Sequence, residues 1–150
     1  MANNFFRSAR VLRAEHPELS PSEICDMLSV RVMYEELPDR VKGFCFCAYG
    51  RKAIVINRDL RHDEIPFCIA HELGHALFHD KINYLFISDS TGFVNGKFER
   101  EADLFAAALL LDEKEIVLNE SITTETISNQ SFIPLAAVEA WLQNVQTEIK

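Results

Sequence analysis

The chain has 150 residues, of which 48% are hydrophobic and 25% are charged, as is usual for one globular domain. Its formal net charge of −8 argues against direct binding to nucleic acid or to anionic membranes. No apolar run is long enough for a signal peptide or a membrane span, and the four cysteines lack the spacing of a secreted disulfide framework. A cytoplasmic protein with reduced thiols is therefore expected.

The first part of the chain predicts two helices and then a small sheet. Residues 3–15 have helical spacing, and the sequence Ser-Pro-Ser-Glu at 20–23 is the signature of a capped helix start. Residues 30–36 alternate as a half-buried strand does. The Gly-Arg pair between the apolar runs 43–49 and 53–57 predicts an antiparallel hairpin. We therefore expect a small antiparallel sheet of about three strands.

The next segment, Phe67 to Phe78, is nearly apolar all round and should be a buried helix. His71 and His75 are four residues apart, share one helix face and complete the pattern H-E-x-x-H with Glu72. Glu72 lies about 100° further round the helix, beside a bound metal rather than on it. Because two imidazoles and a carboxylate in an apolar helix need a partner, this context favours a metal site.

A second helix is expected to complete that site. Residues 80–96 form a mixed segment, either an irregular active-site loop or a short hairpin, and residues 98–111 are a strong helix former. Glu99 and Asp103 share one face of this helix. Catalytic zinc sites commonly use two histidines and a glutamate, so Glu99 can be the third ligand. Asp103 can accept a hydrogen bond from the outer nitrogen of a liganding histidine and fix its tautomer.

Other residues compete for these places. His79 lies about 12 Å along the helix from His71, too far for both to bind one ion, so a capping or hydrogen-bonded histidine is favoured over a substrate contact. Cys68 could be a thiolate ligand, but a buried inert thiol is favoured. Glu101 points to nearly the opposite side of its helix from Glu99, which makes it the weaker candidate for the third ligand.

The C-terminal part predicts a short helix at 112–119, a linker or loop at 121–131 and an amphipathic helix from Pro134 to Ile149. We expect residues 1–120 to form the metal-binding domain. Residues 121–150 would be a linker and a helix that packs on this domain or extends it. The expected fold class is α+β, with the sheet packed against the H-E-x-x-H helix and the second ligand-bearing helix.

The segments 71–79 and 99–110 resemble the corresponding helices of the ImmA/IrrE family of gluzincin-type metallo-endopeptidases. With the similar upstream residues 54–71, the likeness covers about residues 8–118. One departure is Leu111, followed by Asp112, where many members have a methionine-proline pair. The resemblance implies a minimal zincin-like domain with one Zn²⁺. It also implies site-specific cleavage of a helix-turn-helix transcriptional repressor, an anti-repressor role in which the partner binds DNA.

The expected reaction is hydrolysis of a peptide bond. His71, His75 and Glu99 would hold the zinc, Glu72 would be the general base on the attacking water, and Asp103 would orient a histidine. A substrate strand could add to an exposed edge of the sheet. Three residues are unranked candidates for stabilising the oxyanion: Tyr84, His79 and His62.

Three alternatives stay open at this point. A non-proteolytic regulator that sequesters a partner would use zinc structurally, and Glu72 would then have no task. A deformylase-like hydrolase would need Cys45 or Cys47 as a ligand, although the residues around them do not resemble that enzyme's Glu-Gly-Cys motif. A toxin component of a toxin–antitoxin pair is the third alternative. The oligomeric state is not predicted.

Overall fold

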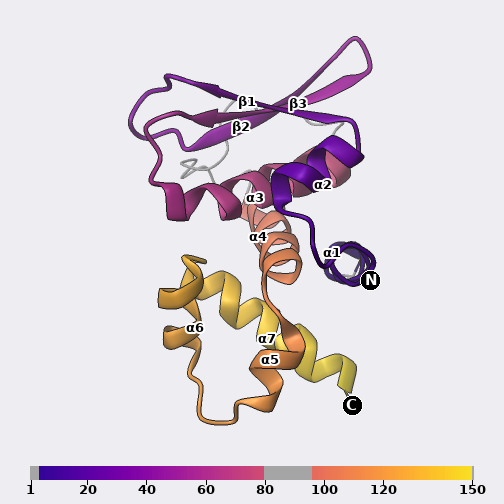
Figure 1. Cartoon of the computed structure of the whole chain (residues 1–150), viewed down its shortest axis with the longest axis vertical. Helices are drawn as coiled ribbons and strands as arrows, with labels where there is room; N and C mark the ends of the chain where they lie inside the picture. The colour runs from indigo at the N-terminus through magenta and orange to yellow at the C-terminus, as the bar shows by residue number, and fades with distance from the viewer. Residues whose placement is uncertain (1–3, 80–95, 150) are drawn as a thin grey trace.

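A three-stranded sheet forms one layer of the molecule, with helices against one of its faces (Figure 1). The computed structural model describes residues 4–79 and 96–149. The strands are β1 (Val30–Glu35), β2 (Gly43–Ala48) and β3 (Arg51–Asn57), in the order β1-β3-β2. The α+β class and the number of strands agree with the sequence prediction.

The prediction of a wholly antiparallel sheet is wrong for one strand. β2 and β3 form the predicted antiparallel hairpin, whose turn contains Tyr49 and Gly50, both at positive φ. β1 pairs with β3 in parallel, because β3 returns between the two strands that precede it. β3 is the central strand, with hydrogen-bonded neighbours on both edges, and its residues from Ala53 to Ile56 are all buried.

Two helices precede the sheet and join it to the rest of the fold. They are α1 (Asn4–Glu15) and α2 (Pro21–Met27). The predicted capping box is present at the start of α2, where the Ser20 side chain accepts from the Glu23 amide and the Ser20 amide donates to Glu23 Oε2 at 2.7 Å. α2 packs on β1 and α1 packs on α4.

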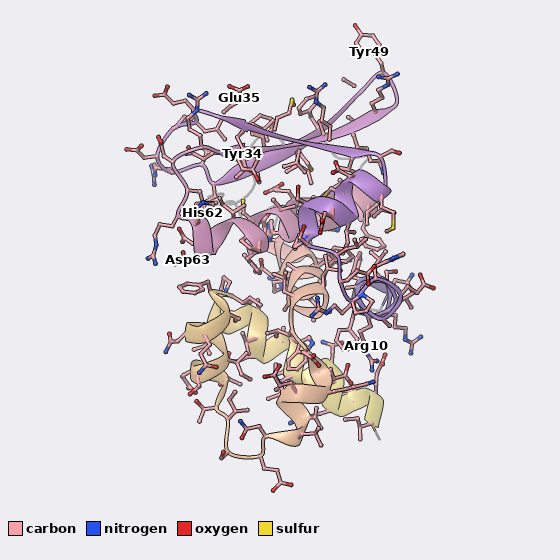
Figure 2. All side chains as sticks on the ribbon, in the orientation of Figure 1. Arg10, Tyr34, Glu35, Tyr49, His62 and Asp63 are labelled. Atoms are coloured by element: carbon pink, nitrogen blue, oxygen red, sulfur yellow. The ribbon has the colours of Figure 1, made fainter. Side chains whose placement is uncertain are left out.

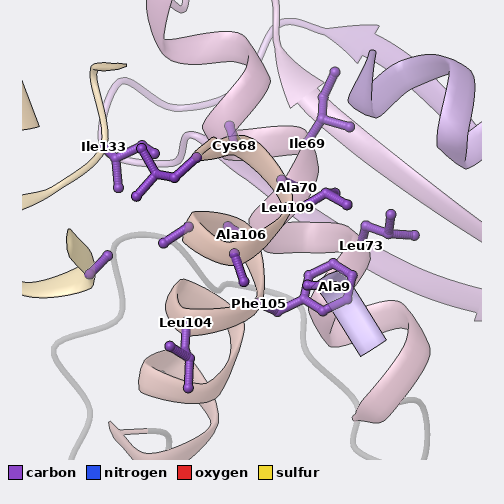
Figure 3. Close-up of a cluster of buried hydrophobic side chains, with 14 of the residues drawn as sticks. Ala9, Cys68, Ile69, Ala70, Leu73, Leu104, Phe105, Ala106, Leu109 and Ile133 are labelled. Atoms are coloured by element: carbon purple, nitrogen blue, oxygen red, sulfur yellow. The ribbon is translucent and has the colours of Figure 1, made fainter. Parts of the chain in front are cut away.

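The two helices predicted to carry the site pack directly on each other. α3 (Ile65–Phe78) follows the short 3-10 turn η1 (His62–Glu64) and lies against β2 and β3, while α4 (Gly96–Leu110) covers its other side. Gly74 permits this approach, since a Cβ there would lie only 3.2 Å from Phe105 Cδ1. Figure 3 shows Leu73, Phe105 and Leu109 in the buried cluster between these helices. The absence of a side chain at Gly74 therefore places α4 within reach of the histidines on α3.

The C-terminal part contains three further helices, α5 (Glu113–Leu118), α6 (Thr124–Ser131) and α7 (Leu135–Ile149). The prediction of a linker or loop at 121–131 is wrong, because α6 occupies most of this segment. The Thr123 side chain caps α6 by accepting from the Thr126 amide at 3.1 Å, and Ile127 is buried. The threonines and serines that suggested a loop thus include the residue that starts the helix.

The C-terminal helices are joined to the rest of the fold by packing and by ion pairs. α7 packs on α4 and buries Val138 and Trp141. Arg10 of α1, labelled in Figure 2, pairs with Glu113 of α5 and with Glu148 of α7. The division of the chain at residue 120 stays a prediction. None of the described helices is long and apolar enough to cross a membrane.

Candidate metal centre

The two histidines of H-E-x-x-H point their outer nitrogens at one place. His71 and His75 lie one turn apart on α3, both buried, with ring centroids 4.8 Å apart. Their Nε2 atoms are 3.2 Å apart. The Nδ1 atom of His71 lies 2.8 Å from Asp103 Oδ1, and that of His75 lies 2.8 Å from His79 Nδ1. With each Nδ1 engaged on the opposite side, the two Nε2 lone pairs can face a shared ion.

α4 supplies the third member of the group. Glu99 places Oε1 at 2.9 Å from His75 Nε2 and Oε2 at 3.2 Å from His71 Nε2. Ligands at about 2.0–2.1 Å from a tetrahedral zinc are roughly 3.3 Å from one another. The separations among His71, His75 and Glu99 are close to that value, so these residues fit a metal ion. They form a group of potential metal ligands within the described part of the chain, and their role as zinc ligands stays a prediction.

Asp103 lies behind His71, where the helical spacing placed it. Its Oδ1 is 2.8 Å from His71 Nδ1. An ionised carboxylate only accepts hydrogen bonds, so the imidazole donates through Nδ1. When His71 is neutral, this tautomer leaves its Nε2 lone pair available to a metal.

Glu72 is fully buried on α3, beside the candidate ligands His71 and Glu99. Its side chain is 0% exposed, and neither carboxylate oxygen has a hydrogen-bond partner among the described residues. Burial, opposed by His71 and reinforced by Glu99, raises the pKa of Glu72 to about 7. A carboxyl group with this pKa exchanges a proton readily near neutral pH, which is what a general base must do.

The charges of the other members of the site are strongly coupled. Burial lowers the pKa of His71, but hydrogen bonds to Asp103 and Glu99 outweigh it and raise this pKa to about 10. Burial lowers the pKa of His75. Burial raises the pKa of Glu99, yet its contacts with His71 and His75 outweigh burial and lower this pKa overall. The group of ligands is therefore suited to a positive charge between Glu99 and the two imidazoles.

His79 and Glu101 extend the network beyond the three candidate ligands. His79 is buried at the C-terminal end of α3, with Nδ1 near His75 Nδ1 and Nε2 2.7 Å from Glu101 Oε2. His79 is therefore a hydrogen-bonded histidine, which is the role that the sequence favoured over a contact with substrate. The contact of Glu101 with His79 was not predicted, because the spacing of carboxylates along one helix does not show which of them meets a side chain of the other helix. The sequence signal for this contact is His79 itself, a third histidine four residues after His75, which needs a hydrogen-bond partner when it is buried.

The remaining candidates lie elsewhere. Tyr84 and the segment 80–95 are outside the described residues. His62 is exposed on η1 and does not line the cleft beside the site. Cys45 and Cys68 are buried, and burial raises the pKa of both thiols well above the usual range, which disfavours a thiolate. Neither they nor the exposed Cys47 belongs to the group of potential ligands.

A cleft of about 430 Å³ lies beside His71 and Glu99. α3 contributes Phe67 to its wall, and the segment between α6 and α7 contributes Phe132 and Ile133. His71 and Glu99 of the candidate site therefore face a cleft that both polar and apolar side chains line.

The comparison with known proteins agrees with this geometry. Residues 25–138 match the IrrE N-terminal-like domain of peptidase family M78, a range that contains every candidate site residue. Uncharacterized immunity region protein 2 of Bacillus phage phi105 is 32% identical over 117 residues, 77% of this chain and 74% of that protein. Metallopeptidase ImmA of Bacillus subtilis (strain 168) is 33% identical over 102 residues, 67% of this chain but 57% of its own length. The chain thus belongs to the IrrE N-terminal-like family of metallopeptidases, which confirms the resemblance found in its two central helices.

Proposed function

We propose that this protein is a zinc-dependent endopeptidase of the cytoplasm that cleaves a helix-turn-helix transcriptional repressor at a specific site. The observation that carries the proposal is Glu72, a buried carboxylate without a hydrogen-bond partner among the described residues, next to three converging ligand atoms. A structural metal site or a surface that only sequesters a partner does not require this residue. A hydrolytic site does, because the attacking water must lose a proton.

The donor set supports zinc as the metal. Two imidazoles and one carboxylate are a common set in catalytic zinc sites. When bound, zinc lowers the pKa of a water from 15.7 toward about 7 and polarises the carbonyl to be attacked. In this proposal His71, His75 and Glu99 hold the ion. Glu72 takes the proton from the water and delivers it to the leaving amine.

The surroundings of the site support an extended peptide as substrate. β2 is at the edge of the sheet in the described part of the chain, and Gly43 at its start lies close to Cys68 of α3. A peptide that added to β2 would run beside the helix that carries His71. The net charge of −8 suits a basic protein partner such as a DNA-binding repressor. The choice of a repressor comes from the family resemblance.

The test compares wild type with Glu72→Gln, using purified helix-turn-helix repressors as candidate substrates. We expect wild type to give two fragments by mass spectrometry and Glu72→Gln to give none, with equal zinc content. Glu36→Gln, the same change at an exposed position, is the matched control and should cleave normally. Equal derepression by Glu72→Gln without cleavage would instead favour sequestration.

A further inference from the structure

We propose that His79 and Glu101 form a relay of two positioning residues that sets the tautomer and ring orientation of His75 for metal binding. The inference rests on the proposed role of His75 as a ligand. Neither residue is one of the three candidate ligands, and their contacts run in sequence from Glu101 to His79 to the ligand His75.

The chemistry of the three side chains gives the relay one direction. An ionised Glu101 can only accept, so the 2.7 Å contact requires a hydrogen on His79 Nε2. A neutral His79 then has a lone pair on Nδ1, which accepts from His75 Nδ1 across 2.8 Å. With its hydrogen on Nδ1, a neutral His75 presents the Nε2 lone pair toward Glu99 and His71.

The surroundings of His79 hold this relay in place. Its backbone amide donates to the His75 carbonyl at 2.8 Å, at the end of α3. Phe98 of α4 meets the His79 ring edge-on at 4.6 Å between centroids, and Phe5 of α1 lies at 5.8 Å. A ring fixed by three helices loses little further entropy when it orients a neighbour.

α4 thereby supplies both the ligand and the two outer acceptors. Glu99 lies among the ligand atoms, Asp103 accepts from His71 directly, and Glu101 acts on His75 through His79. His71 has its acceptor at the rim of the site, where the Asp103 side chain is 31% exposed. The acceptor of His75 is more deeply buried, since the His79 side chain is only 2% exposed. The relay lets a carboxylate act on the buried histidine without an unpaired charge beside it.

The test measures zinc affinity by competition with a chromogenic chelator, without any peptide substrate. His79→Leu removes the acceptor and should weaken zinc binding by about 10- to 100-fold. His79→Asn places Oδ1 near the former position of Nδ1 and should keep most of the affinity. Glu101→Gln should weaken binding in the wild-type background and have no further effect when combined with His79→Asn. Lys97→Met is the control, because Lys97 lies 3.8 Å from Glu101 but outside the relay, and it should change nothing.

A spectroscopic measurement tests the same inference without a variant. In zinc-loaded wild type, long-range ¹H–¹⁵N NMR should show His79 protonated on Nε2 and unprotonated on Nδ1. The opposite tautomer, a His79→Leu protein with unchanged affinity, or His79→Asn as weak as His79→Leu would each overturn the relay. If His79→Leu does not fold, the tautomer of His79 in wild type and the zinc affinity of His79→Asn still test the relay. Zinc binding without any peptide cleavage would count against the proposed function alone, whereas a wild type that binds no zinc would overturn both.

Discussion

Glu72 and Glu99 are two glutamates in one site, yet their surroundings shift their pKa values in opposite directions. On the α3 side, burial raises the pKa of Glu72 to about 7, and no described residue hydrogen-bonds to its carboxylate. On the α4 side, the contacts with His71 and His75 outweigh burial and lower the pKa of Glu99. The two pKa values therefore differ because Glu99 contacts two imidazoles, and not only because Glu72 is more deeply buried.

This difference assigns two tasks to two identical groups. A carboxylate that stays ionised between imidazoles is suited to a cation, whereas one with a pKa near neutrality is suited to accept and return a proton. Matched substitutions on the two sides can therefore test the comparison, since glutamine keeps the size of either side chain and removes its charge.

The largest expected effect is that of Glu72→Gln on turnover. Loss of a general base typically costs about 10²- to 10⁴-fold in rate, and we expect kcat to fall by that factor. Zinc affinity should stay unchanged, because Glu72 is not in the group of ligands. The measurement is kcat on a cleaved protein or peptide substrate, together with chelator competition for zinc. A Glu72→Gln variant that loses zinc as well as activity would show that Glu72 is a metal ligand, and the contrast with Glu99 would be wrong.

Glu99→Gln should give the opposite pattern. The neutral amide is a poor substitute for a carboxylate between two imidazoles, so zinc affinity should fall by more than the roughly 10- to 100-fold typical of an outer hydrogen-bond partner. Activity at limiting zinc should fall in parallel and recover partly at high zinc. Metal content after dialysis gives the result directly. Retention of stoichiometric zinc would exclude Glu99 as the third ligand.

The raised pKa of Glu72 predicts a pH dependence of stability in protein stripped of zinc by a chelator. The folded state binds this proton more tightly than the unfolded chain does, because the pKa rises from 4.5 to about 7 on folding. The stabilisation is complete below pH 4.5 and is lost as the pH rises to about 7, a decrease on the order of 3 kcal/mol. Urea unfolding should show that the free energy of unfolding decreases less between pH 5 and pH 7 for Glu72→Gln than for wild type. Identical decreases in both proteins would contradict the raised pKa.

Asp103→Ala should have the smallest effect in this series. It removes the acceptor behind His71, and we expect zinc affinity to fall by about 10- to 100-fold, toward the lower figure because Asp103 is partly exposed. Asp39→Ala, at an exposed position in the connection from β1 to β2, is the matched control. An effect as large as that of Glu99→Gln would mean that Asp103, rather than Glu99, holds the metal.

The parts of the site that follow a helical period could be predicted from the sequence. His71, His75 and Asp103 have positions fixed by periods of four residues, and Glu99 followed from the need for a third ligand. The contact between Glu101 and His79 depends on how α4 crosses α3, which no single-helix pattern contains. The parallel pairing of β1 likewise depends on strand order, which alternation within a strand does not encode.

The two helices of the site meet at Gly74, but the ligands come from points roughly 24 residues apart in the chain, at His75 and Glu99. An ion held by both residues acts as a reversible cross-link that closes the intervening segment into a loop. On a loop-entropy argument, closing a loop of this length removes about 3 kcal/mol of freedom from the unfolded chain. Removal of the proposed metal would therefore lower the stability of the fold as well as the activity, so metal supply would affect both.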